Sequence, residues 1–140
     1  MKSNKNKIIL VVAAAAIAYF LFFMPNKSTS IQKTDIKIPK LSLTAKKGKL
    51  AFDNNCARCH GENAAGTDNG PPLVHDIYNP GHHADMAFYR AAKMGTKQHH
   101  WTFGDMPSQN QVSKNDVTRI IKYIRELQEA NGIVYKEHRM

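Results

Sequence analysis

The C-terminal part of the chain carries the clearest helical pattern. Its apolar side chains recur at i, i+3, i+4 and i+7, which predicts a helix with one buried face. Ser113 to Asp116 has the form of a capping box with a short acid, which marks the start of this helix, and Gly132 marks its end. The side chains of the apolar face are Ile120, Tyr123, Ile124 and Leu127.

Two further helices are predicted, from about Ala45 to Asn55 and from about Ala84 to Met94, with Gly95 placed to cap the second. No segment alternates between apolar and polar residues convincingly enough to predict a sheet. Residues 61–83 have no regular period and are too long for an ordinary connection. We therefore expect an all-α fold of three or more helices that wraps around something other than its own side chains.

The N-terminus has the pattern of an export signal. Residues 1–7 carry three lysines and no acid, and residues 8–24 form an uninterrupted apolar run of 17 residues. Residues 16–18 resemble a signal-peptidase site, but the strongly apolar residues 19–23 would then lie just beyond the cut. We favour an uncleaved transmembrane helix, with the lysines held in the cytoplasm by the positive-inside rule.

The rest of the chain divides into a linker, one domain and a tail. Residues 25–42 are rich in Lys, Ser and Thr, which predicts a flexible tether. Residues 43–132 suit one small folded domain, and residues 133–140 form a short tail. A domain of this size has a marginal core when it is built of side chains alone, so a large apolar cofactor would supply buried area.

The formal net charge of +9 raises nucleic acid, anionic lipid and acidic proteins as partners. Residues 1–42 hold seven lysines against one acid, whereas residues 43–132 hold eleven basic residues against nine acids. A nucleic-acid-binding domain needs a basic face on its folded part. We therefore expect no nucleic acid among the partners.

Cys56-Ala57-Arg58-Cys59-His60 has the spacing of a c-type haem attachment site. The two thiols can add to the two haem vinyl groups, and the imidazole that follows can bind the iron. The main alternative is a redox-active C-x-x-C pair, but the strand-helix-strand pattern that usually surrounds such a pair is missing. A structural zinc site could be assembled only with a further remote histidine.

With these motifs the chain resembles a class I, mono-haem cytochrome c of the bacterial type, over roughly Thr44 to Gly132. Gly48 and Phe52 stand eight and four residues before the first cysteine, as in that family. The resemblance implies that the first and last helices cross closely at this glycine, with Tyr123 in the contact. It also implies a covalently bound haem c.

The segment Gly70-Pro71-Pro72-Leu73 is similar to the G-P-x-L segment of the same family. The resemblance implies that the carbonyl of Pro71 accepts the free N–H of His60, which fixes the ring and strengthens it as a ligand. It also implies that Leu73 packs on the haem.

Met106 is the expected second axial ligand of the iron, opposite His60. Pro107 biases it away from helical geometry into an extended strap, and family sequences place their axial Met in such a Gly-x-Met-Pro setting. Met86 and Met94 lie in a helical pattern and are expected to be packing residues. A histidine is the main rival for the distal position.

Histidines are unusually dense in the segment expected on the distal side of the haem, and they have two interpretations. A pair could bind copper, or one could displace Met106 from the iron. Alternatively they are loop histidines that bond a propionate or cap the helix near Ala84. We favour the second interpretation, because adjacent residues point in different directions and neither doublet is a ready-made chelate. The residues are His75, His82, His83, His99 and His100.

Trp101 and Phe103 precede Met106 in the same loop. They could wall the haem, with the indole N–H bonded to a propionate, or they could be ordinary core aromatics. We count Trp101 among the candidate cofactor-binding residues.

We expect a single-electron carrier of the respiratory chain rather than an enzyme, since iron held by protein on both axial sides binds no substrate. Its partners would be membrane or soluble redox proteins, met in transient contacts. The haem domain would lie in the periplasm or extracytoplasmic space, on a single-pass anchor in the cytoplasmic membrane. One alternative is a haem-based ligand sensor or peroxidase-like protein with a labile distal ligand, and another is a non-haem thiol oxidoreductase.

Overall fold

The structure, a computed structural model, describes Ala13, Tyr19 and residues 35–137. The chain divides into two units, residues 1–30 and residues 31–140, and the account below concerns the second. Residues 1–7 lie outside the described part, as do nearly all of the predicted anchor and the first part of the tether. Within the part that is described, no helix has the length and apolar character needed to cross a membrane.

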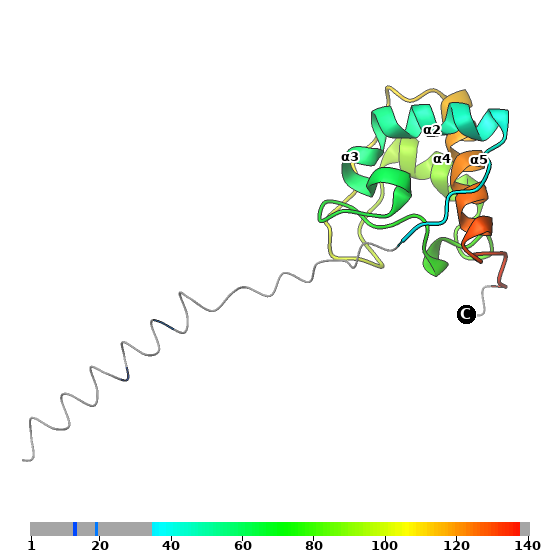
Figure 1. Ribbon diagram of the computed structural model, residues 1–140. Helices are drawn as coiled ribbons and strands as arrows, with labels where there is room; N and C mark the ends of the chain where they lie inside the picture. Colours follow the sequence, from blue (N-terminus) through cyan, green and yellow to red (C-terminus); the bar gives the residue numbers. More distant parts are fainter. Residues whose placement is uncertain (1–12, 14–18, 20–34, 138–140) are drawn as a thin grey trace, which may run out of the picture. The chain divides into compact units, whose positions relative to one another are not determined.

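The described part of the domain is all-helical, as the sequence predicts, and contains no β-strand (Figure 1). Only two isolated β-bridges occur there, one of which joins Thr96 to Met106. The helices are α2 (Leu43–Asn55), α3 (Ala57–His60), α4 (Asp85–Met94) and α5 (Lys114–Ala130), with 3-10 turns η1 (Glu62–Ala64) and η2 (Asp76–Tyr78).

Polar side chains at the helix starts explain where the long helices begin. The hydroxyl of Ser42 accepts a hydrogen bond from the backbone N–H of Ala45 at 3.1 Å, so α2 begins two residues earlier than predicted. The hydroxyl of Ser113 accepts from the N–H of Asp116 at 3.1 Å, which confirms the predicted cap of α5.

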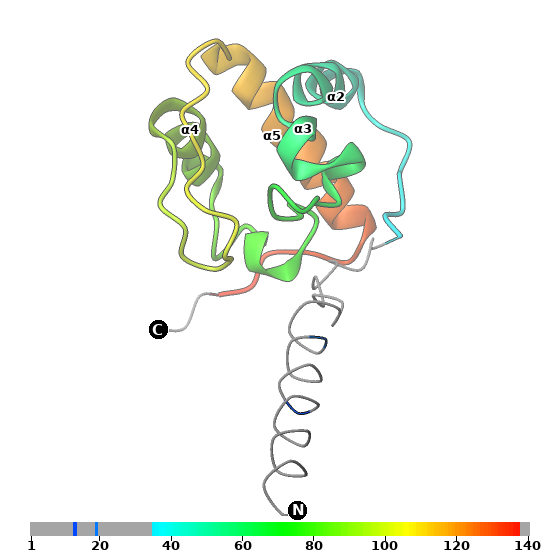
Figure 2. The same ribbon diagram turned by 90° about the vertical axis from the view of Figure 1, so that its left-hand side faces the viewer.

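The central contact of the domain is the crossing of α2 and α5, which Figure 2 shows from the side. A Cβ atom on Gly48 would lie 1.9 Å from the carbonyl oxygen of Arg119 and 3.0 Å from Cβ of Tyr123. The helix backbones therefore touch at this glycine, which confirms the predicted close crossing. The rings of Phe52 and Tyr123 pack beside it with centroids 5.7 Å apart.

The core extends from this crossing along α5. Its buried side chains come mainly from α2 and α5, with Leu73 and Val74 added from the irregular segment. In contrast, α4 has no fully buried residue. It is held partly by Arg125 of α5, whose guanidinium lies 5.0 Å from the ring centroid of Phe88. The side of α4 that faces the rest of the domain is therefore free to line a cavity.

The irregular segment between α3 and α4 is fastened to α5 by two polar side chains. The buried amide of Gln128 donates to the carbonyls of Leu73 and Tyr78 at 2.9 and 3.0 Å. The guanidinium of Arg125 donates to the Tyr78 carbonyl and to the amide oxygen of Gln128 at 2.9 and 2.6 Å. These bonds satisfy backbone acceptors that a loop without regular structure would otherwise bury unpaired.

The last residues of the expected tether belong to the folded domain. Ile36 and Leu41 pack against its core. The amide of Asn131 exchanges two hydrogen bonds of 2.9 Å with the backbone of Lys37, and the N–H of Ser42 donates to Glu126 at 3.0 Å. The structure therefore differs from the sequence prediction for residues 35–42, because Asn131 and Glu126 supply partners that composition alone does not indicate.

We expect Gly48→Ala to lower the free energy of unfolding of the haem-loaded protein by about 1–3 kcal/mol, because the added methyl must push α2 and α5 apart. This loss would occur although alanine is the better helix former. Urea unfolding followed by circular dichroism measures it. Lys47→Ala, at an exposed neighbouring position of α2, is the control and should change stability by less than about 0.5 kcal/mol.

Candidate functional site

The motif from Cys56 to His60 occupies one tight turn that continues α2 into α3. Cys56 is the residue between the two helices, and its carbonyl accepts the N–H of His60 at 2.9 Å. The hydroxyl of Thr67 donates to the carbonyl of Cys59 at 2.6 Å, which ties the turn to the following loop. Both thiols and the imidazole are thus presented from one short, well-bonded segment.

The imidazole of His60 is oriented by Pro71. Its Nδ1 lies 2.9 Å from the carbonyl oxygen of Pro71, the contact that the family resemblance implies. Because a carbonyl can only accept, Nδ1 carries the proton and the lone pair is left on Nε2. Burial lowers the pKa of His60, and the bond to Pro71 offsets this only in part. The residue is therefore a neutral imidazole with one nitrogen available to a metal.

The two thiols do not have the character of a redox-active pair. Cys56 and Cys59 are free cysteines that are not joined in a disulfide. Burial, and then the proximity of Cys59, raise the pKa of Cys56 to about 11. Reactive C-x-x-C pairs instead depend on a thiolate with a lowered pKa. This environment disfavours the thiol oxidoreductase interpretation.

Met106 lies on an extended strap that is paired with the end of α4. The backbones of Thr96 and Met106 exchange hydrogen bonds of 3.0 and 2.9 Å. Gly95 ends α4 with a φ of 76°, as its predicted cap, and a Cβ atom there would lie 2.4 Å from the carbonyl oxygen of Met106. The strap can therefore run close to α4 only because residue 95 is glycine.

The other two candidate methionines are not packing residues, contrary to the sequence prediction. Met86 and Met94 are 61% and 68% exposed, since the apolar spacing of α4 does not correspond to a buried face. Met94 still borders the same cavity as Met106, whereas Met86 does not.

A cavity of about 720 Å³ brings together the candidate residues from all parts of the sequence. This volume falls in the range of cofactor and ligand pockets. Apolar side chains of α4 and α5, namely Phe88, Val117 and Ile120, close one side. The sequence pattern of α5 indicated Ile120 as core, but not that it also faces a cavity. The candidates on the lining are Cys56, Cys59, His60, Pro71, Leu73, Trp101 and Met106.

Trp101 provides a test of whether this cavity fits a haem. Its Nε1 is a buried donor with no acceptor among the described residues. Burial raises the pKa of Tyr78, and the nearby indole of Trp101 lowers it by a smaller amount. The indole N–H nevertheless does not reach hydrogen-bond geometry with any partner in the described part of the chain. A buried unpaired N–H costs about 1–3 kcal/mol. A carboxylate such as a haem propionate would satisfy it, so the residues fit the group.

Four of the five distal histidines converge on the edge of the same cavity: His82, His83, His99 and His100. The expectation that adjacent histidines point apart is wrong here, because the ring centroids of His82 and His83 lie 4.7 Å apart. Burial and neighbouring imidazoles lower the pKa of His83 and His100. His75 is separate: it packs edge-on against Trp101 at 5.1 Å.

The sequence model of the family described as Cytochrome c matches residues 45–128, which is more than half of the chain, so the chain belongs to the cytochrome c family. This match confirms the resemblance drawn from the sequence motifs. The cofactor is therefore a covalently bound haem c, and the family's function is haem-based electron transfer. No curated protein and no solved structure was found to match the chain.

We expect Trp101→Phe to lower the free energy of unfolding of the haem-loaded protein by about 1.5–3 kcal/mol, because it removes a donor to a charged acceptor. Denaturant unfolding followed at the haem absorption measures this. If Trp101 is only a core aromatic, the loss stays below about 1 kcal/mol. Tyr78→Phe is the control for removing a polar group from the same neighbourhood.

Proposed function

We propose that this chain is a membrane-anchored electron carrier in which Cys56 and Cys59 attach the haem and His60 and Met106 bind its iron. The observation that carries the proposal is that these four residues line the same cavity. The hydrogen bond from His60 to Pro71 supports the proximal assignment, and the pairing of Met106 with Thr96 supports the distal one.

The chain's own residues determine what the site can do. When bound, the haem supplies an iron that alternates between the ferrous and ferric states and so carries one electron. Pro71 holds the His60 ring and strengthens it as a ligand. A thioether from Met106 favours the reduced ion and raises the potential. Leu73, which is nearly buried, and the aromatic side chains of Phe88, Trp101 and Phe103 give the cavity an apolar lining.

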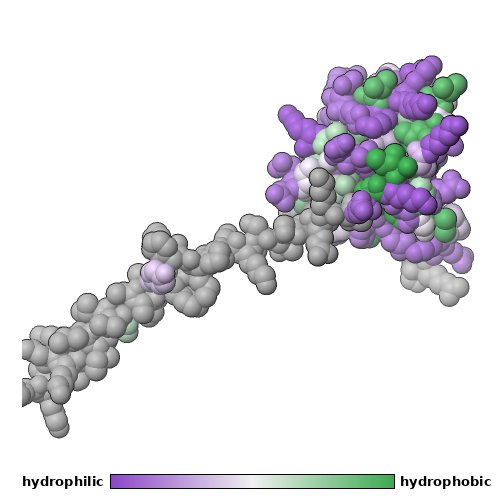
Figure 3. All heavy atoms as spheres, in the orientation of Figure 1, coloured by the Kyte–Doolittle hydropathy of each residue, from purple (hydrophilic) through white to green (hydrophobic). Residues whose placement is uncertain are grey.

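The proposed partners are membrane or soluble redox proteins that dock transiently near the haem edge. The face of the described domain seen in Figure 3 is mostly hydrophilic, with small separate apolar patches. Small polar contact areas are typical of weak electron-transfer encounters. Residues 25–34 of the tether lie outside the described part of the chain, as does nearly all of the anchor, and together these segments would keep the domain at the outer face of the cytoplasmic membrane.

Spectra of two matched variants test the distal ligand. The oxidised native protein and Met94→Leu should both show the iron-thioether charge-transfer band, and their reduced forms should not bind carbon monoxide. Met106→Leu should lose the band completely, and its reduced form should bind carbon monoxide, because this substitution removes the thioether that binds the iron. Met94 is the suitable control because it borders the same cavity.

The opposite outcome would favour the alternative function. A native protein that lacks the band, or whose reduced form binds carbon monoxide readily, has an open or labile distal position. It would then be a haem-based sensor or a peroxidase-like protein rather than an electron carrier.

Fractionation of cells tests the anchor. We expect haem-stained full-length protein in the membrane fraction after a carbonate wash, because an apolar run of 17 residues is long enough to span a bilayer. Replacement of residues 1–24 by a cleavable signal peptide should move all of the haem stain to the soluble periplasmic fraction. Native protein found in that fraction with Tyr19 as its first residue would show instead that the segment is a cleaved signal.

A further inference from the structure

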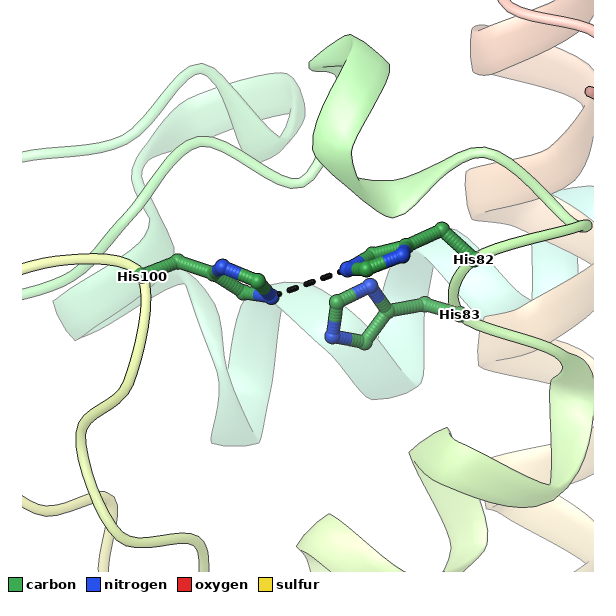
Figure 4. Close-up of side chains that lie close together, drawn as sticks. All are labelled: His82, His83 and His100. Carbon is green, nitrogen blue, oxygen red and sulfur yellow. Dashed lines mark hydrogen bonds between the residues drawn. The ribbon is translucent and has the colours of Figure 1, made fainter. Parts of the chain in front are cut away.

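Three histidines of the cavity edge form a cluster that the proposed haem ligation does not use. One ring nitrogen from each of His82, His83 and His100 lies within 4.8 Å of the others. His82 and His83 come from the loop before α4, whereas His100 comes from the opposite loop, and the three rings converge (Figure 4). The Nε2 atoms of His82 and His100 are 3.1 Å apart. One of these nitrogens must therefore hold a lone pair that faces the other ring.

The loop that carries His82 and His83 is fixed by the rest of the domain. The side-chain oxygen of Asn79 accepts the N–H groups of Gly81 and His82 at 2.9 and 3.2 Å. The guanidinium of Arg125 donates to the carbonyl of His83. Nδ1 of the His83 ring donates to the carbonyl of Ile77 at 2.8 Å, which leaves its lone pair on Nε2. Backbone carbonyls orient metal-binding imidazoles in this way.

The opposite loop closes on itself and presents His100. The carboxylate of Asp105 pairs with the ammonium of Lys97 at 2.6 Å and accepts the N–H of Gln98 at 3.1 Å. The side-chain oxygen of Gln98 accepts the N–H of Gly104 at 2.9 Å. The loop is thus bonded across its base, and the histidine lies beyond that base. Both loops that carry the cluster are therefore tied by hydrogen bonds before any ligand arrives.

We propose that His82, His83 and His100 bind one divalent ion of the late first-row transition metals, with Cu²⁺ held more tightly than Zn²⁺. Neutral imidazoles suit copper, zinc and nickel, whereas hard ions such as Mg²⁺ and Ca²⁺ prefer oxygen ligands. Cu²⁺ heads the order of affinity for a given set of nitrogen ligands. Three protein ligands leave at least one position of the ion to water. This site is additional to the haem and does not depend on electron transfer.

The crowding of imidazoles around the cluster favours a bound metal ion over added protons. His99 stacks against His83 at 5.9 Å and lies 4.3 Å from His100, so four imidazoles crowd together. Each added proton would be repelled by the next, whereas a single divalent ion satisfies several lone pairs at once.

The test uses the oxidised, haem-loaded full chain in detergent, produced without a polyhistidine tag. Equilibrium dialysis against Zn²⁺ or Cu²⁺, followed by metal analysis, gives the number of ions bound and the dissociation constant. Electron paramagnetic resonance of the Cu²⁺ form reports nitrogen ligands. The variants are His82→Gln, His100→Gln and the triple variant His82→Gln/His83→Gln/His100→Gln. His75→Gln is the matched control, since His75 lies outside the cluster.

We expect one ion per chain, nitrogen hyperfine structure on Cu²⁺, and a dissociation constant at least about tenfold weaker in each single variant. The triple variant should retain no ion, and His75→Gln should match the native protein. The haem absorption spectrum should stay unchanged throughout, which shows that the variants are folded. The proposal fails if the triple variant binds as tightly as the native chain. It also fails if any of the three substitutions alters the axial ligation of the haem, because the histidine would then serve the iron instead.

Discussion

The contact of α2 and α5 at Gly48 is the constraint on which the rest of the domain depends. It is the most extensive contact between helices in the described residues, and a side chain at that position would overlap the backbone of Arg119. The motif that begins at Cys56 continues directly from α2, while Gln128 and Arg125 of α5 hold the irregular segment. One helix pair therefore fixes both sides of the cavity, and the chain between these points needs no regular structure.

The sequence predicted the helices well because their signals are local. Capping side chains and the apolar spacing of α5 gave helix type and approximate ends, but the start of α2 was misplaced by two residues and the short helix α3 was not predicted. The role of residues 35–42 could not be predicted, because it depends on Asn131 and Glu126, which lie more than 80 residues away in the chain. Polar contacts of that kind leave no periodic trace.

The candidate site was predicted through motifs rather than through geometry. The cysteine-histidine spacing and the Gly-Pro segment indicated residues that do line one cavity. Metal binding by a pair of histidines was considered from the sequence but not favoured, because His82 and His100 lie eighteen residues apart and meet only when their loops fold toward each other. The cavity thus combines a part that sequence specifies, for the haem, with a part that tertiary structure alone reveals.

The most direct test of the account is the mass of the full chain purified from a host that matures c-type cytochromes, followed by mass analysis of its proteolytic peptides. We predict that the chain carries the added mass of one haem and that this mass stays on the peptide containing Cys56 and Cys59. A chain of unmodified mass, or a haem attached to any other peptide, would contradict the claim that these thiols hold the cofactor in the cavity.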